Sequence, residues 1–312
     1  MKKVSIIGSG GVGAATAAAI LRNCSCVIQL NDRIDGLAEG HAMDIRQSLP
    51  LTDTGSLFDG SSDVKDIQNS DFIIITAGFP RKEGMSRIDL LDKNRRVMCE
   101  IGRHITAYSP KAVVLVITNP VDHLTYYFKK DFPELNVFGF GCSLDSFRYQ
   151  YFIAKKLNVN PTNVSGLILG THDANMFPYI EGTSVGGVPV VQLLSEKEIE
   201  AILSKTISAG TEIVQLLKTT GSSYTAGQIM GRIAKSIVNE IPDIFSVDVV
   251  LDGQMGFQDV ALSLPCIIGK NGIEKVIDIP ASSACFHKLK EIERQFKQTC
   301  LEHGKEERAS SV

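Results

Sequence analysis

The 312-residue sequence contains no tryptophan and no excess of charge of one sign: 32 Lys and Arg side chains face 35 Asp and Glu, for a formal net charge of −3. Proteins that bind the phosphate backbone of nucleic acid normally carry a basic face. The sequence also lacks any run approaching the roughly 20 apolar residues that span a bilayer as a helix. We therefore expect neither a nucleic-acid partner nor a membrane association.

Patterns typical of disulfide frameworks and metal sites are missing as well. The seven cysteines are odd in number and scattered, and none forms a C-x-x-C pair. The N-terminal apolar stretch is too short for a secretory signal. These features favour a reducing, cytoplasmic compartment, and they predict no metal site.

The first half of the sequence alternates short apolar runs with helical stretches. Continuous apolar runs are typical of strands that are buried on both faces of a parallel sheet. Such runs occupy residues 4–8, 26–30, 71–76, 112–118 and 136–140, and helical stretches occupy residues 14–23, 36–48 and 89–109. The alternation predicts an α/β fold with an open, doubly wound parallel sheet.

The pattern changes after about residue 144. A long helical stretch over 196–219 is followed by antiparallel signals in 259–280, where Asn271-Gly272 separates two apolar runs as in a β-hairpin. The sequence therefore predicts a second, α+β domain over residues 144–312.

A glycine-rich turn follows the first predicted strand, with Gly8, Gly10 and Gly13 in the pattern G-x-G-x-x-G. The first glycine permits a tight turn, the second lets a pyrophosphate approach, and the third lets helix and strand pack closely. Asp32 ends the second strand, where its carboxylate can bind ribose hydroxyls and repel a 2′-phosphate. The alternative is a structural turn with a surface aspartate. We predict NAD as the cofactor; Arg33, beside Asp32, leaves NADP use open.

A basic loop over residues 78–87 follows the strand at 71–76. It has glycines near both ends and contains the cations Arg81, Lys82 and Arg87. Open α/β sheets bind ligands at the carboxyl ends of their strands, so this placement favours a flap that closes on an anion. The alternative is a solvated charged loop.

Four segments together resemble the lactate/malate dehydrogenase family, most closely its branch of lactate-dehydrogenase-like malate dehydrogenases. They are AGFPRKEGMSR (77–87), ITNPVD (117–122), LDSFRY (144–149) and GTH (170–172). The similarity extends over nearly the whole chain. It implies a doubly wound parallel (Rossmann) sheet in a dinucleotide-binding domain over 1–143, a second α+β catalytic and substrate domain over 144–312, and a homodimer or homotetramer.

The resemblance assigns the catalytic roles. His172 directly follows an apolar run over residues 164–170 that predicts one buried strand. It would be the proton donor and acceptor, which suits a group that titrates near neutral pH. Asp145 would orient its imidazole, and Arg87 would polarise the keto oxygen of the substrate. Arg148, one helical turn after Asp145, would bind the C1 carboxylate of the substrate through its planar guanidinium.

The resemblance also implies binding residues in both halves. Asn119 would contact substrate and nicotinamide ribose, and Ser223, next to Ser222, would line the substrate pocket. The predicted cofactor contacts are Gly8, Gly10, Gly11, Val12, Gly13, Asp32, Thr76, Ala77, Gly78, Asn94, Thr118 and Asn119.

Arg81 indicates the substrate. In the family's pattern, an arginine here pairs with the second carboxylate of oxaloacetate or malate, whereas the lactate branch has an uncharged residue. Closing the flap on pyruvate would leave this cation desolvated and unpaired, which is unfavourable. The prediction is therefore an NAD-dependent malate dehydrogenase that acts on a small dicarboxylate. The alternatives are a lactate or other 2-hydroxy-acid dehydrogenase, and a catalytically inactive NAD-binding paralogue.

The sequence departs from the family directly after His172. The family usually has Gly-Asp, whereas this chain has Asp173-Ala174. Two interpretations are open. Either Asp173 approaches the imidazole and favours its charged form, or the turn is reshaped.

Overall fold

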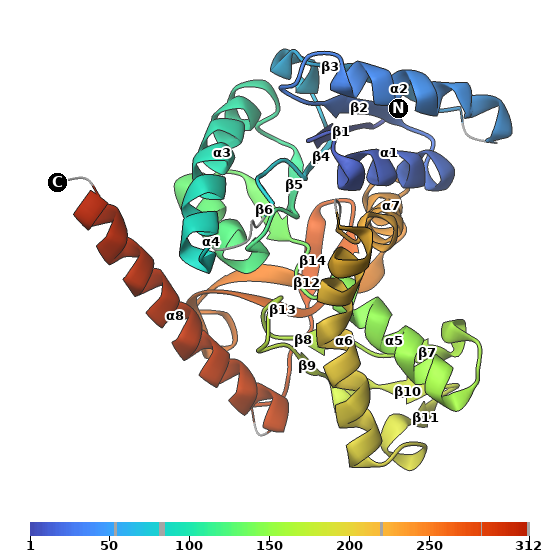
Figure 1. Ribbon diagram of the computed structural model, residues 1–312, viewed down its shortest axis with the longest axis vertical. Coiled ribbons are helices and arrows are strands. Elements are labelled where there is room, and N and C mark those ends of the chain that lie inside the picture. The colour runs from blue at the N-terminus through green and yellow to red at the C-terminus, as the bar shows by residue number, and fades with distance from the viewer. Residues whose placement is uncertain (53–54, 81–84, 219–220, 282, 311–312) are drawn as a thin grey trace. The chain divides into compact units, whose positions relative to one another are not determined.

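The computed structural model describes residues 1–52, 55–80, 85–218, 221–281 and 283–310. The chain forms two compact units (Figure 1), and each contains segments that are distant in sequence. Unit 1 comprises Met1–Gly139, Thr211–Ile244 and Ile267–Lys275, and unit 2 comprises Phe140–Gly210, Phe245–Cys266 and Val276–Val312.

Unit 1 is built on six parallel strands in the order β6-β5-β4-β1-β2-β3. The strands are β1 (Lys3–Ile7), β2 (Val27–Asn31), β3 (Leu57–Ser61), β4 (Phe72–Ile75), β5 (Val113–Val116) and β6 (Asn136–Gly139). The connecting helices are α1 (Gly11–Asn23), α2 (Leu37–Gln47), α3 (Arg87–Tyr108) and α4 (Val121–Asp131). Every residue of β4 and β5 is buried, as the continuous apolar runs predicted.

The strand order reverses between β1 and β4, because the chain runs outward from β1 to β3 and then returns to start again at β4. The carboxyl ends of strands at such a switch point are where open α/β sheets bind ligands. The predicted doubly wound parallel fold is thus confirmed, and the glycine-rich turn after β1 lies at the switch point.

Helix α7 (Ser223–Val238) also belongs to unit 1, where it lies beside α1 (Figure 1). Small residues permit this close packing: a Cβ atom at Gly227 would lie 2.7 Å from the carbonyl carbon of Ala15, and one at Gly231 would lie 2.9 Å from the Cβ of Ala19. The predicted boundary at 143/144 lies close to the end of the first segment of unit 1. The first unit ends its first segment at Gly139 and later takes in Thr211–Ile244 and the hairpin segment Ile267–Lys275.

Most of the remaining elements fall in unit 2. Its helices are α5 (Ser143–Leu157), most of α6 (Glu196–Leu217) and α8 (Ala284–Ser310). Its strands are β7 (Val164–Ser165), β8 (Ile168–Leu169), β9 (Phe177–Pro178), β10 (Ser184–Val185), β11 (Val188–Pro189), most of β12 (Asp243–Asp252) and most of β13 (Gln258–Gly269). β13 is followed by β14 (Gly272–Val276) after the predicted Asn271-Gly272 turn, in which Gly272 has a φ of +77°.

The prediction of one buried strand over residues 164–170 is wrong. The segment forms two short strands in different sheets, β7 beside β10 and β8 beside β9. The break falls at Gly166, whose carbonyl oxygen accepts a hydrogen bond from Gln150 Nε2 at 2.9 Å instead of continuing a ladder. His172 therefore follows the two-residue strand β8.

None of the helices in the described ranges combines the length and the apolar character needed to cross a membrane.

Candidate functional site

The three motif positions of unit 1 are occupied by glycine for different structural reasons. Gly8 has a φ of +110°, and a Cβ atom there would lie 2.5 Å from the backbone nitrogen of Ala77. A Cβ atom at Gly13 would overlap the carbonyl oxygen of Gly8. At Gly10, however, no described atom lies within 4 Å of the position a Cβ atom would take. Packing thus requires the first and third glycines, while the second leaves open the space that a pyrophosphate would occupy.

Helix α1 begins directly at this turn. Gly10 is its N-cap, and among the described residues no side chain caps the helix there. The first N–H groups of a helix have no partner inside the helix, and with the positive end of the helix dipole they form a site for phosphate groups. The turn therefore fits a dinucleotide.

Asp32 is fixed beside the glycine-rich turn. Its Oδ2 accepts a hydrogen bond from the backbone nitrogen of Ser9 at 2.6 Å, and its Oδ1 accepts one from that of Ile34 at 3.0 Å. Each carboxylate oxygen has a further lone pair for a ribose hydroxyl. Ser9 occupies a variable position of the G-x-G-x-x-G motif, so the motif carries no signal that this residue would hold Asp32.

The carboxyl ends of β1, β4 and β5 are joined by side-chain hydrogen bonds. Thr76 Oγ1 donates to the carbonyl oxygen of Gly8 at 2.8 Å, and Thr118 Oγ1 donates to that of Ala77 at 2.7 Å. A Cβ atom at Gly78 would overlap the methyl group of Thr118. These predicted cofactor residues thus lie together, along the edge that also carries the glycine-rich turn.

Asn94, on α3, is fully buried and joins two loops at this edge. Its Nδ2 donates to the carbonyl oxygens of Phe79 at 3.1 Å and Asn119 at 2.7 Å, and its Oδ1 accepts from the backbone nitrogen of Phe79 at 2.7 Å. Both amide hydrogens are therefore used within the protein. This geometry suits a residue that arranges the loops around a cofactor.

The other predicted residues of unit 1 lie at helix starts or outside the described part. Ser223 begins α7, and its Cβ lies 3.8 Å from the position of a Cβ atom at Gly11. Arg87 begins α3, which Ser86 caps by accepting a hydrogen bond from the Asp89 nitrogen at 3.0 Å. The side chain of Arg87 and the whole of Arg81 lie outside the described residues.

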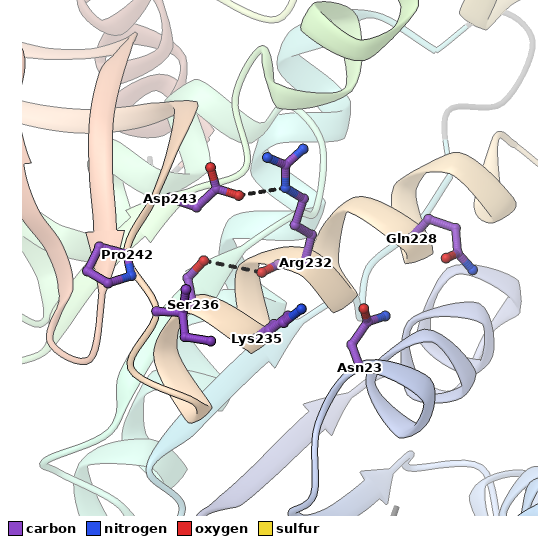
Figure 2. Close-up of a pocket in the computed structure, with 8 residues that line it drawn as sticks. Asn23, Gln228, Arg232, Lys235, Ser236, Pro242 and Asp243 are labelled. Carbon is purple, nitrogen blue, oxygen red and sulfur yellow. Dashed lines mark hydrogen bonds and ion pairs between the residues drawn. The ribbon is translucent and has the colours of Figure 1, made fainter. Parts of the chain in front are cut away.

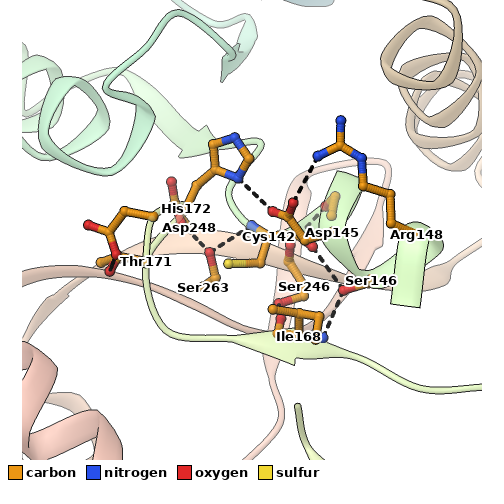
Figure 3. Close-up of polar contacts among 12 residues, drawn as sticks. Cys142, Asp145, Ser146, Arg148, Ile168, Thr171, His172, Ser246, Asp248 and Ser263 are labelled. Atoms are coloured by element: carbon orange, nitrogen blue, oxygen red, sulfur yellow. Dashed lines mark hydrogen bonds and ion pairs between the residues drawn. The ribbon is translucent and has the colours of Figure 1, made fainter. Parts of the chain in front are cut away.

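The predicted catalytic residues of unit 2 meet at one carboxylate (Figure 3). Asp145 is 1% exposed; its Oδ2 lies 2.5 Å from His172 Nδ1, and its Oδ1 accepts a hydrogen bond from Arg148 Nη1 at 3.2 Å. Figure 3 shows the imidazole and the guanidinium reaching this carboxylate from opposite sides. Asp145 and Arg148 share one face of α5, as their spacing of three residues predicted.

The charge state of Asp145 follows from these contacts. Burial by itself disfavours the ionised carboxyl, but the charges and hydrogen bonds of His172 and Arg148 outweigh burial and hold the pKa of Asp145 below its usual range. An ionised carboxylate accepts the Nδ1–H of His172, fixes the ring, and stabilises its protonated form. This arrangement suits an acid–base histidine with an orienting carboxylate.

Asp173 shapes the turn that carries His172. Its Oδ1 accepts hydrogen bonds from Thr171 Oγ1 at 2.9 Å and from the backbone nitrogen of Asn175 at 2.8 Å. These bonds connect the residue before His172 with a residue after it. Of the two interpretations of the Asp173-Ala174 departure, these contacts favour a reshaped turn.

A surface pocket of about 380 Å³ lies elsewhere on unit 1 (Figure 2). Two of the residues that line it form an ion pair, between Arg232 Nε and Asp243 Oδ2 at 2.6 Å. The described residues that line it include none of the predicted site residues. Nor do the described residues contain a group of three or more His, Cys, Asp and Glu side chains placed to hold a metal ion.

Two family models match almost the whole chain. The NAD-binding domain of lactate/malate dehydrogenase matches residues 2–139, and the α/β C-terminal domain of the same family matches residues 142–307. The chain belongs to the lactate/malate dehydrogenase family. The NAD-binding domain contains the glycine-rich turn and Asp32, and its match confirms the predicted NAD cofactor.

Individual members of the family are similar over nearly their full length. The malate dehydrogenase of Staphylococcus carnosus is 38% identical, covering 90% of this chain and 91% of the relative. The malate dehydrogenase of Cytophaga hutchinsonii is 36% identical, covering 97% and 96%. Among solved structures, the apo malate dehydrogenase of Picrophilus torridus is 33% identical with a TM-score of 0.92, covering 97% of this chain and 98% of that one.

Proposed function

We propose that the chain is an NAD-dependent malate dehydrogenase, in which His172 exchanges a proton with the substrate while a hydride passes between NAD(H) and malate or oxaloacetate. The observation that carries this proposal is the His172–Asp145–Arg148 cluster, with two charged groups on one buried carboxylate. The cluster lies in a chain of the lactate/malate dehydrogenase family, whose malate dehydrogenases are similar over 90% or more of it.

The proton transfer follows from the geometry of His172. Because Nδ1 is committed to Asp145, Nε2 is the atom that delivers a proton to the developing alkoxide in oxaloacetate reduction and removes it in malate oxidation. Asp145 stabilises the imidazolium while His172 carries the proton. NADH, when bound, supplies the hydride.

Arg148 and the residues of unit 1 would bind the reactants. Arg148 Nη1 contacts Asp145, so the C1 carboxylate of the substrate would use the remaining N–H groups of the guanidinium. Arg87 would polarise the keto oxygen, and Asn119 and Ser223 would line the substrate site. The glycine-rich turn, Asp32, Thr76, Ala77, Gly78, Thr118 and Asn119 would hold NAD, with Asn94 arranging the loops around it.

The choice of a dicarboxylate rests on Arg81, which lies outside the described residues. The test compares kcat/KM for oxaloacetate and pyruvate, with NADH, in the wild type and in Arg81→Gln. We expect the wild type to prefer oxaloacetate and the variant to shift toward pyruvate, because the variant no longer leaves a cation unpaired over the smaller substrate. An unchanged preference would overturn the assignment of Arg81.

The same assay separates an enzyme from an inactive NAD-binding paralogue. The wild type should consume NADH with oxaloacetate, and the paralogue would consume none above background with either substrate. Repeating the assay with NADPH measures how strictly Asp32 excludes the 2′-phosphate when Arg33 is beside it.

We further infer a homodimer or homotetramer in the cytoplasm. Large apolar side chains on α2 and near it support a contact between copies, since Ile34 and Met43 are more than half exposed. The scattered, odd-numbered cysteines support a reducing compartment. Sedimentation of the purified protein would give the number of subunits, and cell fractionation the compartment.

A further inference from the structure

A second buried carboxylate lies in unit 2, and the proposed proton transfer does not use it. Asp248 on β12 and Ser263 on the neighbouring strand β13 are both 0% exposed, and Ser263 Oγ donates a hydrogen bond to Asp248 Oδ1 at 2.6 Å. Burying a carboxylate and a hydroxyl in a sheet is unfavourable unless their hydrogen bonds are satisfied. The cost of burying this pair indicates that it has a role in unit 2.

Ser263 holds the segment that leads to His172. Its backbone nitrogen donates to the carbonyl oxygen of Gly170 at 2.7 Å, and its carbonyl oxygen accepts from the Gly170 nitrogen at 3.2 Å. This is a single antiparallel bridge. Gly170 precedes His172 by only two residues, so the bridge fixes the base of the turn that carries the imidazole.

The side chain of Ser263 holds the segment that leads to Asp145. Its Oγ accepts a hydrogen bond from the backbone nitrogen of Cys142 at 2.9 Å, and Cys142 is the residue directly before α5 (Figure 3). A Cβ atom at the preceding residue, Gly141, would overlap both Ser263 Oγ and Asp248 Oδ1. The pair is therefore packed directly against the turn from which α5 starts.

Asp248 determines the direction of the Ser263 hydroxyl. A hydroxyl has one hydrogen to donate and two lone pairs to accept with. When the hydrogen points at Asp248 Oδ1, a lone pair faces the Cys142 N–H; without that acceptor the hydroxyl could turn its hydrogen elsewhere. Asp248 thus fixes the acceptor that anchors the start of α5.

We propose that the buried Asp248–Ser263 pair is a positioning device that holds His172 and Asp145 at their 2.5 Å separation. One residue, Ser263, anchors the His172 turn through its backbone and the Asp145 helix through its side chain. The inference rests on the proposed roles of His172 and Asp145. Neither Asp248 nor Ser263 touches substrate or cofactor in this proposal, so both are positioning residues.

The primary test is Ser263→Ala, which removes the hydroxyl and keeps the backbone bridge to Gly170. With the Cys142 N–H unanchored, Asp145 and His172 separate, and the protonated imidazole loses stabilisation. We expect the NMR titration midpoint of the His172 ring to fall below that of the wild type, with kcat reduced about tenfold and KM for NADH unchanged. The His172 signal is assigned from its loss in His172→Gln.

Two further variants separate positioning from stability. Asp248→Asn keeps an oxygen that can accept the Ser263 hydrogen, so its titration midpoint and kcat should stay closer to the wild type than those of Ser263→Ala. The double variant Asp248→Val/Ser263→Ala removes the buried carboxylate together with the hydroxyl that bonds to it. It should therefore unfold at a higher temperature than Ser263→Ala while keeping the lowered midpoint.

The matched control is Ser5→Ala, on β1 of unit 1. Ser5 is likewise 0% exposed, and its Oγ shares a hydrogen bond with Ser70 Oγ at 2.7 Å. Its loss should lower the melting temperature and leave kcat and the His172 midpoint unchanged. The proposal is overturned if Ser263→Ala keeps the wild-type midpoint and kcat, or if Ser5→Ala changes both as much.

The titration needs no turnover, so it distinguishes this inference from the proposed function. A wild type that does not consume NADH with oxaloacetate would overturn the proposed function; a lowered midpoint in Ser263→Ala would still support the positioning of His172 by the pair. Turnover in the wild type with no effect of Ser263→Ala would overturn the positioning alone.

Discussion

In unit 2 the proposed site residues are charged side chains bonded to one another. In unit 1 the proposed site residues whose side chains the structure describes are mostly glycines and polar residues whose hydrogen bonds run to the backbone. His172, Asp145 and Arg148 share one carboxylate. In unit 1, by contrast, Gly10 contributes by leaving space empty, and Asn94 by bonding to two carbonyl oxygens.

This difference predicts different sensitivities to substitution. Exchanging a functional group of the unit 2 cluster at constant size should reduce turnover, because the proposed role of the cluster depends on charge and proton transfer. Adding atoms to the glycine-rich turn should weaken folding or NADH binding, because both depend on close approach to the backbone of the turn. Variants of the unit 2 cluster can therefore impair proton transfer and leave NADH binding intact, and variants of the glycine-rich turn can impair NADH binding without removing the proton-transfer group.

The largest effect is expected for His172→Gln. Glutamine keeps a polar side chain but cannot exchange a proton, and general acid–base catalysis contributes about 10²–10⁴-fold. We expect kcat to fall by about 10³-fold, while the Kd for NADH stays unchanged because the glycine-rich turn is untouched. Steady-state kinetics and a fluorescence titration with NADH measure the two quantities. A rise in Kd as large as the fall in kcat would contradict the separation of roles.

The next effect compares two glycines of one turn. Alanine at Gly13 would overlap the Gly8 carbonyl oxygen, and such overpacking destabilises a fold by about 1–3 kcal/mol. Alanine at Gly10 meets no described atom within 4 Å and suits the Gly10 φ of −68°. We therefore expect Gly13→Ala to lower the melting temperature, and Gly10→Ala to keep the wild-type melting temperature but weaken NADH binding.

Thermal unfolding and NADH titration of both glycine variants check this prediction. Gly10→Ala that binds NADH as tightly as the wild type would show that the open space beside Gly10 does not receive the cofactor.

The sequence predicted most of unit 1 because its buried strands are continuous apolar runs with glycine or polar residues at their ends. It did not predict β3, whose sequence LFDGS contains two residues with low strand propensity. Gly60 is nevertheless needed there, because a Cβ atom would overlap the carbonyl oxygen of Ala38 on α2. Only the tertiary packing explains that glycine.

Unit 2 was harder to predict because its strands are short and its buried polar residues resemble surface residues. The two-residue strands β7 and β8 have no periodicity to detect, so the apolar run over residues 164–170 predicts a single strand. Ser246 and Asp248 alternate with apolar residues, as on a half-exposed strand, yet both are 0% exposed. Motif resemblance predicts His172, Asp145 and Arg148 as site residues, and it cannot reveal a supporting pair outside the motifs.

The smallest effect is expected for the pH dependence of stability in Asp145→Asn. Because the pKa of Asp145 is lower in the folded protein than its usual value near 3.9, its ionisation stabilises the fold above that value. This stabilisation is lost as the pH falls through the folded pKa. Asp145→Asn removes the carboxylate at similar size. The stability gap between wild type and variant should therefore shrink as the pH falls below about 4, as urea unfolding at several acidic pH values would measure.

An exposed carboxylate provides the control for this pH effect. The Glu198 side chain is 38% exposed, and hydrogen bonds from Lys156 and Ser195 lower its pKa to about 2. Water and salt screen such a pair, so the effect of Glu198→Gln should vanish in high salt. The effect of Asp145→Asn should persist there, because its partners act on a carboxylate that is 1% exposed. If salt abolished both effects equally, the unit 2 carboxylate would behave as a surface charge, and its contrast with the backbone-built site of unit 1 would fail.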